Sequence, residues 1–117
     1  GYTVAIGGDV SEPGFSRTTQ CAVIPNFDIP SAYINDDARQ FRFTNQTTTD
    51  DHGMHIVGVA ADQAGNTFYK VKNSWGITGK YDGFIYVSKP FVALRTTNIM
   101  VNKNGIPADI AKKMGLK

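Results

Sequence analysis

Two strand-type runs separated by a short turn constrain the fold of this chain more than any other feature. The first run, His52–Val59, is rich in valine and isoleucine, and the second, Val71–Trp75, follows a similarly β-prone stretch. Between them, Asp62–Asn66 is a cluster of turn-forming residues. This order of patterns predicts a β-hairpin.

Strand alternation predicts which side chains of the hairpin share a face. One face carries His52, Met54, Ile56 and Gly58 from the first run, and Tyr69, Val71, Asn73 and Trp75 from the second. A four-residue loop over 62–65, with Ala61 opposite Asn66, places His52 opposite Trp75 and Met54 opposite Asn73. His52 and Asn73 are then diagonal neighbours, with backbones roughly 7–8 Å apart. A register slip of one residue would separate them.

The remaining elements are predicted to be short. Strands are expected at Tyr2–Ile6, Gly83–Ser88 and Thr97–Val101, and Cys21–Ile24 is a strand or a buried connection. Helices are expected over Asn35–Phe43, with Asn35 as N-cap, as one turn over Pro90–Leu94, and over Pro107–Met114. Residues 1–117 thus form a single domain of the α+β class, with a mainly antiparallel sheet.

The composition excludes several classes of protein. A chain of 117 residues with 41% hydrophobic and 19% charged residues is suited to one globular domain. The net charge of +2 is too small to imply a nucleic-acid or membrane partner, and no apolar run is long enough to span a bilayer. We therefore expect no nucleic acid and no membrane among the partners. A lone cysteine, Cys21, excludes an internal disulfide.

A metal site is the first alternative for the polar residues of the hairpin. Asp50, Asp51, His52 and His55 are potential ligands, and a His-x-x-His spacing suits zinc on a helix. The glycines and valines of this run indicate a strand, however, and there a separation of three residues sends His52 and His55 to opposite faces. We therefore expect no metal and no cofactor, and His52 is the candidate functional histidine.

The catalytic alternative requires a histidine held by a hydrogen-bond acceptor, so that its other nitrogen faces a nucleophile. The Asn73 side-chain oxygen would do this without adding charge, which suits a thiolate–imidazolium pair. Trp75, on the same face, would keep water away from that hydrogen bond. Taken singly, a histidine at the start of a strand and an asparagine at its end are more often structural residues. The combination is what indicates catalysis.

Three sequence blocks together resemble the C-terminal half of papain-like cysteine peptidases: 51–58 (DHGMHIVG), 72–76 (KNSWG) and 83–85 (GFI). The first strand pattern, continued through Val10, is similar to the strand that begins the second lobe of these enzymes. Within the family, the bleomycin hydrolase and bacterial aminopeptidase C group is most similar. That likeness rests on the first strand, on Met54 after the histidine, and on the tail from Met100 to Pro107.

The resemblance implies the right-hand lobe of a papain-like fold, a half-barrel of mainly antiparallel strands, in which His52 is the general base. Asn73 would orient the imidazole and Trp75 would shield their contact. In this family the nucleophilic cysteine lies in an N-terminal lobe, well over a hundred residues upstream. Cys21 lacks the glycine and aromatic neighbours of that nucleophile. We therefore expect a fragment of a longer two-lobe cysteine peptidase, inactive by itself, whose partners are a peptide substrate and the missing N-terminal lobe.

Several alternatives stay open. Gly53 stands where the family more often has alanine, a small change that should not move His52. Lys117 ends the chain before the tail on which aminopeptidase action depends in this group, so exopeptidase and endopeptidase action are both kept as alternatives. A non-catalytic papain-like lobe acting as a binding or regulatory module is the alternative function. The face with His52 would be exposed, or packed on a second copy in a homo-oligomer. The resemblance suggests the cytoplasm, while a secreted or periplasmic location stays open.

Overall fold

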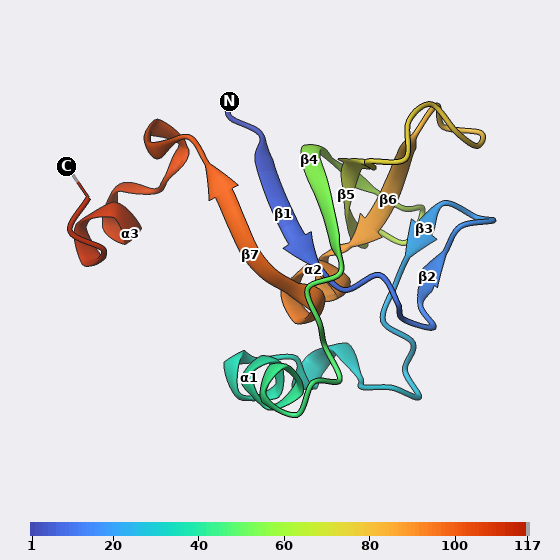
Figure 1. Cartoon of the computed structure of the whole chain (residues 1–117), viewed down its shortest axis with the longest axis horizontal. Helices are drawn as coiled ribbons and strands as arrows, with labels where there is room; N and C mark the ends of the chain where they lie inside the picture. Colours follow the sequence, from blue (N-terminus) through green and yellow to red (C-terminus); the bar gives the residue numbers. More distant parts are fainter. Residues whose placement is uncertain (117) are drawn as a thin grey trace.

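The computed structural model of the chain describes residues 1–116 and shows an α+β fold around a seven-stranded sheet (Figure 1). The strand order is β2-β3-β6-β5-β4-β1-β7. All neighbours are antiparallel except β3 and β6, which run parallel. The predicted fold class is thereby confirmed. The strands are β1 (Val4–Gly8), β2 (Phe15–Ser16), β3 (Cys21–Ala22), β4 (His52–Ala61), β5 (Thr67–Lys72), β6 (Phe84–Ser88) and β7 (Thr96–Val101).

The hairpin of β4 and β5 is present, but its turn differs from the prediction. Ala61 pairs with Thr67 and not with Asn66, so the loop has five residues, 62–66. The Asp62 carboxylate stabilises this longer loop by accepting hydrogen bonds from the backbone N–H groups of Ala64 at 2.9 Å and Asn66 at 2.8 Å. Near the turn the register is therefore one residue away from the predicted one.

An irregularity in β4 cancels this shift before the strand reaches His52. Gly58 pairs with Lys70 while Ile56 pairs with Val71, so Val57 has no partner and forms a β-bulge. Beyond the bulge, His55 pairs with Lys72, which is the predicted register. The register beside His52 is therefore the predicted one. It is restored by a bulge that the sequence pattern does not predict.

Strand β1 begins and ends two residues later than the sequence pattern predicts. Gly7 and Gly8, expected to end the strand, continue it between β4 and β7. A Cβ on Gly7 would lie 2.5 Å from the Asn98 amide nitrogen, and one on Gly8 would lie 2.6 Å from the Arg95 carbonyl oxygen. Glycine is required here because neighbouring groups approach the backbone closely.

The helices follow the predicted caps. The three α-helices are α1 (Asp36–Thr44), α2 (Lys89–Arg95) and α3 (Ala108–Lys113), and two 3-10 turns are η1 (Ser31–Tyr33) and η2 (Lys103–Gly105). Asn35 caps α1 as predicted, with Oδ1 accepting from the Ala38 N–H at 2.9 Å. Helix α2 is longer than the single turn expected, because the Ser88 hydroxyl caps it one residue before Lys89.

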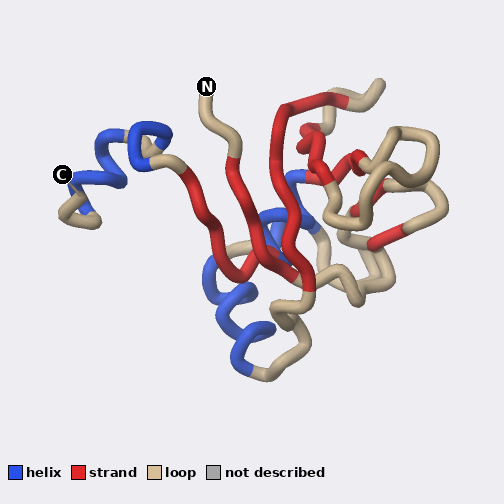
Figure 2. Tube along the Cα trace, turned by 45° about the horizontal axis from the view of Figure 1, so that its top comes forward, coloured by secondary structure: helices blue, strands red, loops and turns tan. Residues whose placement is uncertain are grey.

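The hydrophobic core lies between the sheet and α2. Both views place α2 against the strands and α1 beyond it (Figures 1 and 2). Leu94 of α2 and Val71 and Val87 of the sheet are its largest fully buried side chains. The complete set of buried apolar residues is Ile6, Ala22, Ile24, Met54, Val71, Ile85, Val87, Phe91 and Leu94.

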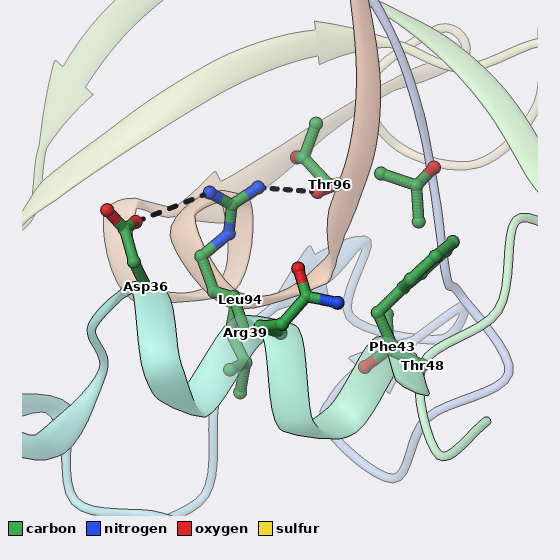
Figure 3. Close-up of a pocket in the computed structure, with 8 residues that line it drawn as sticks. Asp36, Arg39, Phe43, Thr48, Leu94 and Thr96 are labelled. Atoms are coloured by element: carbon green, nitrogen blue, oxygen red, sulfur yellow. Dashed lines mark hydrogen bonds and ion pairs between the residues drawn. The ribbon is translucent and has the colours of Figure 1, made fainter. Parts of the chain in front are cut away.

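Two arginines join helix α1 to the rest of the molecule: Arg42, which pairs with Asp28 at 2.7 Å, and Arg39. The contacts of Arg39 lie beside α2. Its guanidinium donates to the Thr96 carbonyl oxygen at 3.0 Å and lies 3.8 Å from the Asp36 carboxylate (Figure 3). These residues line a hollow of about 450 Å³ between α1 and the junction of α2 with β7. Neither of the candidate catalytic residues, His52 and Asn73, lines this hollow.

Arg95, at the end of α2, is 2% exposed and joins three distant segments. Its guanidinium contacts the carboxylates of Glu12 at 2.9 Å and Asp28 at 2.8 Å, and the Thr48 hydroxyl at 2.7 Å. Burial raises the pKa of Glu12, because the loss of solvent outweighs the opposing effect of the Arg95 charge. Glu12 shares that charge with Asp28. This cluster joins the loop after β1 and the segments on either side of α1 to the core.

The segment after β7 stands apart from the sheet in both views (Figures 1 and 2). None of the residues of α3 is buried. The predicted terminal helix is nevertheless present, with Asp109 in its first turn and Lys112 and Lys113 in its last. Within residues 1–116, no helix has the length and apolar character needed to cross a lipid bilayer.

Candidate active site

The structure brings His52 and Asn73 together. The imidazole Nε2 of His52 lies 2.6 Å from the Oδ1 of Asn73. Asn73 is 7% exposed and His52 is half-buried. A contact this short between a ring nitrogen and an amide oxygen is a hydrogen bond in which the imidazole N–H donates.

The orientation of the Asn73 amide is fixed by a second donor. The backbone N–H of Ser74 donates to the same Oδ1 at 2.8 Å, and only an oxygen can accept from both groups. His52 must then carry its proton on Nε2, which leaves the lone pair on Nδ1. The Ser74 hydroxyl lies 3.4 Å from Nε2 and contributes little at that distance. The geometry therefore presents Nδ1 as the basic nitrogen.

Strand positions account for this meeting. His52 is the first residue of β4 and pairs with Gly8 of β1, while Asn73 follows β5 directly. The Asn73 N–H donates to the Gly83 carbonyl oxygen at 3.0 Å, which continues the β5–β6 ladder by one residue. Burial alternates along β4 as predicted, with Met54 buried and Gly53 and His55 exposed.

Trp75 packs against the imidazole of His52. Its ring centroid lies 4.8 Å from that of His52, at an interplanar angle of 42°. Phe15 of β2 meets the indole edge-on at 6.0 Å, and the Arg17 guanidinium carbon lies 4.5 Å from its centroid. The indole therefore packs against the imidazole, while it remains 39% exposed.

The structure adds Asp51, which the sequence pattern suggested only as a metal ligand. Its carboxylate accepts hydrogen bonds from the Val10 N–H at 3.0 Å and from the Ser11 hydroxyl. Burial alone would raise the pKa of Asp51, but these hydrogen bonds and the charge of His52 together hold it below its ordinary value. Asp51 therefore fixes the start of β4 to the loop after β1. No sequence pattern links residues 10 and 51.

Gln20 is a second residue that the sequence pattern does not single out. Its buried amide donates to the carbonyl oxygens of Thr78 at 3.2 Å and Phe84 at 3.4 Å, and accepts from the Tyr81 N–H at 3.2 Å. These contacts hold the loop from Gly76 to Gly83, which follows directly on Trp75. Gln20 adopts a positive φ of 53°, which is uncommon for a residue other than glycine.

Cys21 lies far from His52. Cys21 pairs with Tyr86 of β6, Tyr86 pairs with Lys70 of β5, and Lys70 pairs with Gly58 of β4. Gly58 is six residues along β4 from His52. Six residues of strand span about 20 Å, and two further strands lie between β3 and β4. Burial raises the pKa of the Cys21 thiol, against a smaller opposing effect of a backbone hydrogen bond. The thiol is therefore neither near the imidazole nor activated.

His55 occupies the opposite face, as strand alternation predicts. It is exposed, and its Nε2 lies 2.7 Å from the Thr3 hydroxyl. Among the described residues, no three of the His, Cys, Asp and Glu side chains gather closely enough to hold a metal ion. His52 borders an open hollow of about 480 Å³ that Asp50, Asp51 and Asn98 also line.

Comparison with known proteins identifies the family. Residues 3–116 match the peptidase C1-like family. The chain belongs to this family. The resemblance to the C-terminal region of papain-like cysteine peptidases is thereby confirmed.

Two curated peptidases share short segments with this peptidase C1-like chain. Cathepsin L1 of Drosophila melanogaster is 49% identical over 35 residues, which is 30% of this chain and 9% of the relative. Cathepsin L of Sarcophaga peregrina is 41% identical over 39 residues, which is 33% of this chain and 12% of the relative. The chain thus spans a small part of the length of these relatives.

A solved structure shares the fold over nearly all of the chain. PepW from Lactobacillus rhamnosis HN001 superposes with a TM-score of 0.67 at 21% sequence identity. The match covers 97% of this chain and 26% of PepW. At this identity the likeness shows the fold alone.

Proposed function

We propose that this chain supplies the histidine-bearing half of the active site of a papain-like cysteine peptidase. His52 is the general base, Asn73 orients it, and Trp75 shields their hydrogen bond. The observation that carries the proposal is the 2.6 Å contact between His52 Nε2 and Asn73 Oδ1, on an amide oxygen that Ser74 also fixes. The nucleophilic cysteine lies on another segment, because Cys21 is remote from His52.

The reaction follows from the position of the imidazole proton. In the assembled enzyme, Nδ1 of His52 takes the proton of the cysteine thiol, and the thiolate adds to the peptide carbonyl carbon. The carbon–nitrogen bond then breaks as the imidazolium returns its proton to the leaving amine, which leaves a thioester. Water hydrolyses the thioester with His52 again accepting the proton. Asn73 keeps Nδ1 directed at these atoms throughout.

The proposal is tested in a longer polypeptide that contains this chain and its N-terminal lobe. Hydrolysis of fluorogenic peptides and alkylation of the nucleophilic cysteine are measured for the unsubstituted protein and for His52→Ala. Loss of the general base should lower kcat/KM by about 10²–10⁴-fold. The 117-residue chain alone should neither hydrolyse peptides nor bind thiol-directed peptidase inhibitors at Cys21. Efficient inhibitor labelling of Cys21 would overturn the assignment.

The finer assignment to the bleomycin hydrolase and aminopeptidase C group belongs to the same proposal. It is supported by Met54 and by the tail from Met100 to Pro107. A peptidase of the exo type would cleave substrates with a free amino terminus and leave the acetylated forms intact, whereas an endopeptidase would cleave both. If the N-terminal lobe has no cysteine that reacts, a non-catalytic binding or regulatory lobe is the remaining function.

A further inference from the structure

Arg17 lies over the ring of Trp75, the tryptophan that packs against His52. Its guanidinium carbon is 4.5 Å from the Trp75 ring centroid, and that centroid is 4.8 Å from the centroid of His52. Both side chains therefore pack against the same indole ring. Phe15, two residues before Arg17, supports the indole edge-on. The cation is thus held in place by its contact with a ring that is itself packed.

Within residues 1–116, the N–H groups of this guanidinium donate no hydrogen bond to another part of the chain. Among the described residues, the ion pairs involve Arg39, Arg42 and Arg95, and Arg17 takes part in none of them. Arg17 is exposed, so its donors are available to a molecule in solution. An arginine stacked on an aromatic ring presents a planar set of donors that matches the two oxygens of a carboxylate.

A hollow of about 290 Å³ adjoins the Trp75 ring. Arg17, Trp75 and Phe15 line it, together with Gln20 and Thr78. No carboxylate of the described residues lines it, so nothing in the hollow repels an anion. Its volume is at the lower end of the range for ligand pockets, which suits a single side chain or chain end.

The chemistry of the proposed reaction assigns this region to one side of the substrate. The imidazolium returns its proton to the leaving amine, so the residues after the scissile bond must lie beside His52. The guanidinium carbon lies 4.5 Å and the imidazole centroid 4.8 Å from the indole centroid, so they are at most about 9 Å apart. That distance is the span of roughly two to three extended residues. Arg17 is therefore within reach of the first residues on the leaving-group side.

We propose that Arg17 is a specificity-determining residue that binds a carboxylate on the leaving-group side of the peptide substrate. This inference rests on the proposed peptidase function. The carboxylate belongs either to an acidic side chain or to the C-terminus of a short leaving peptide, and both present the same two oxygens. Because the pair is exposed, the preference for a carboxylate over a neutral group should be about five- to tenfold.

Binding can be measured on the 117-residue chain without any peptidase activity. Trp75 is the only tryptophan, so tryptophan fluorescence reports this site alone. Three tripeptides serve as probes: Gly-Glu-Gly amide, Gly-Gln-Gly free acid and Gly-Gln-Gly amide. We expect a saturable change with one or both carboxylate peptides at concentrations about five- to tenfold below those needed for the neutral amide. A response to the first alone identifies a side-chain carboxylate, and a response to the second alone identifies a C-terminus.

Matched variants separate the role of Arg17 from general charge effects. Arg17→Met should remove the carboxylate preference, and Arg17→Lys should retain only part of it, since lysine keeps the charge and lacks the planar donors. Lys80→Met is the control, because Lys80 is another exposed cation stacked on a ring, 4.7 Å from the Tyr81 centroid. It should leave the preference intact. Equal responses to all three peptides, or equal effects of Arg17→Met and Lys80→Met, would overturn the inference.

The same variants are then compared in the longer, two-lobe protein. For each variant, kcat/KM is measured for peptides with an acidic residue on the leaving-group side and for peptides with a neutral residue there. We expect the ratio of the two values to fall about five- to tenfold in Arg17→Met and to stay unchanged in Lys80→Met. An unchanged ratio in Arg17→Met would contradict the inference while leaving the peptidase assignment in place. An inactive two-lobe protein would instead contradict the peptidase assignment, and the fluorescence titration would still decide whether Arg17 binds carboxylates.

Discussion

Asn73 Oδ1 is the atom on which the candidate site depends, because two N–H groups converge on it. One belongs to the His52 ring and the other to the Ser74 backbone. The backbone donor cannot rotate away, so it holds the amide oxygen toward the imidazole in every rotamer of Ser74. A neutral acceptor fixed in this way determines which ring nitrogen carries the proton, and hence which nitrogen is the base.

Removing the Asn73 acceptor should therefore change the tautomer of His52. In Asn73→Ala the imidazole loses its partner on Nε2, and nitrogen NMR of the ring should show a mixture of the two neutral tautomers in place of one. In the two-lobe protein, kcat/KM should fall about 10²-fold, since the base is no longer aligned. Ser74→Ala keeps the backbone donor and should retain a single tautomer. A single tautomer in Asn73→Ala would show that the amide does not orient the ring.

Asp51 should make the stability of the chain depend on pH below about 4. Its pKa is lowered in the folded chain, so between the folded and unfolded pKa values the unfolded chain binds more protons. The stabilisation is present above the unfolded pKa and is lost as the pH falls through the folded pKa. Because Asp51 is exposed, Asp51→Asn should lower the free energy of unfolding at pH 7 by no more than about 1 kcal/mol. Urea denaturation at pH 7 and pH 3 would measure this, and an equal difference at both values would contradict it.

The elements around the site depend on loops that residues from other elements hold in place. The loop from Gly76 to Gly83 carries Trp75 at its start, and the Gln20 amide contacts it at Thr78 and Tyr81. Gly79 has a φ of +68°, and a Cβ there would lie 2.3 Å from the Gln20 amide nitrogen. The position of Trp75 is therefore coupled to the packing between Gly79 and Gln20.

Gly79→Ala should move Trp75 as well as destabilise the chain. The substitution combines an unfavourable positive φ with a clash against a buried amide, so we expect a loss of about 2–3 kcal/mol. The displaced loop should also shift the fluorescence maximum of Trp75. Gly65→Ala is a matched control, because Gly65 has a φ of +83° and nothing lies within 4 Å of its Cβ position. It should cost about 1 kcal/mol and leave the Trp75 emission unchanged. Similar emission in both variants would contradict the coupling.

At the scale of the whole molecule, the buried Arg95 cluster joins segments that the sheet does not connect. Arg95 contacts Glu12, Asp28 and Thr48, which lie 83, 67 and 47 positions before it in the sequence. Its Nε has no partner among the described residues, so the cluster is not fully satisfied. A buried cation with two carboxylates is costly to desolvate, and breaking the set leaves charges without a partner.

Arg95→Met should consequently be the most destabilising of these changes. It leaves Glu12 without its cation and close to Asp28, which keeps only its ion pair with Arg42. We expect a loss of about 3–5 kcal/mol in the free energy of unfolding. Asp36→Asn is the comparison, since it breaks an exposed Arg–Asp pair at 3.8 Å and should cost less than about 1 kcal/mol. Chemical denaturation of both variants at pH 7 measures the difference. Equal losses would show that Arg95 contributes only as a surface ion pair.

The sequence by itself determined the local features of this protein. Alternation placed His52 and Asn73 on one face and His55 on the other, and Asn35 predicted the start of α1, because these properties depend on residues a few positions apart. The blocks around His52 and Asn73 also carried the family resemblance. The predicted register beside His52 is correct, but the pattern contained neither the fifth loop residue nor the bulge at Val57. These two irregularities shift the register in opposite directions and cancel.

Only the tertiary structure decided which residues surround the histidine–asparagine pair. Arg17 and Trp75 are 58 positions apart, as are Gln20 and Thr78, and Asp51 meets Val10 across 41 positions. None of these residues belongs to a local pattern that points to its partner. Their contacts exist because the sheet and the core bring the segments that follow β1 close to the start of β4 and to the loop after β5. Long-range pairing depends on the packing of the entire chain, which a window of neighbouring residues does not contain.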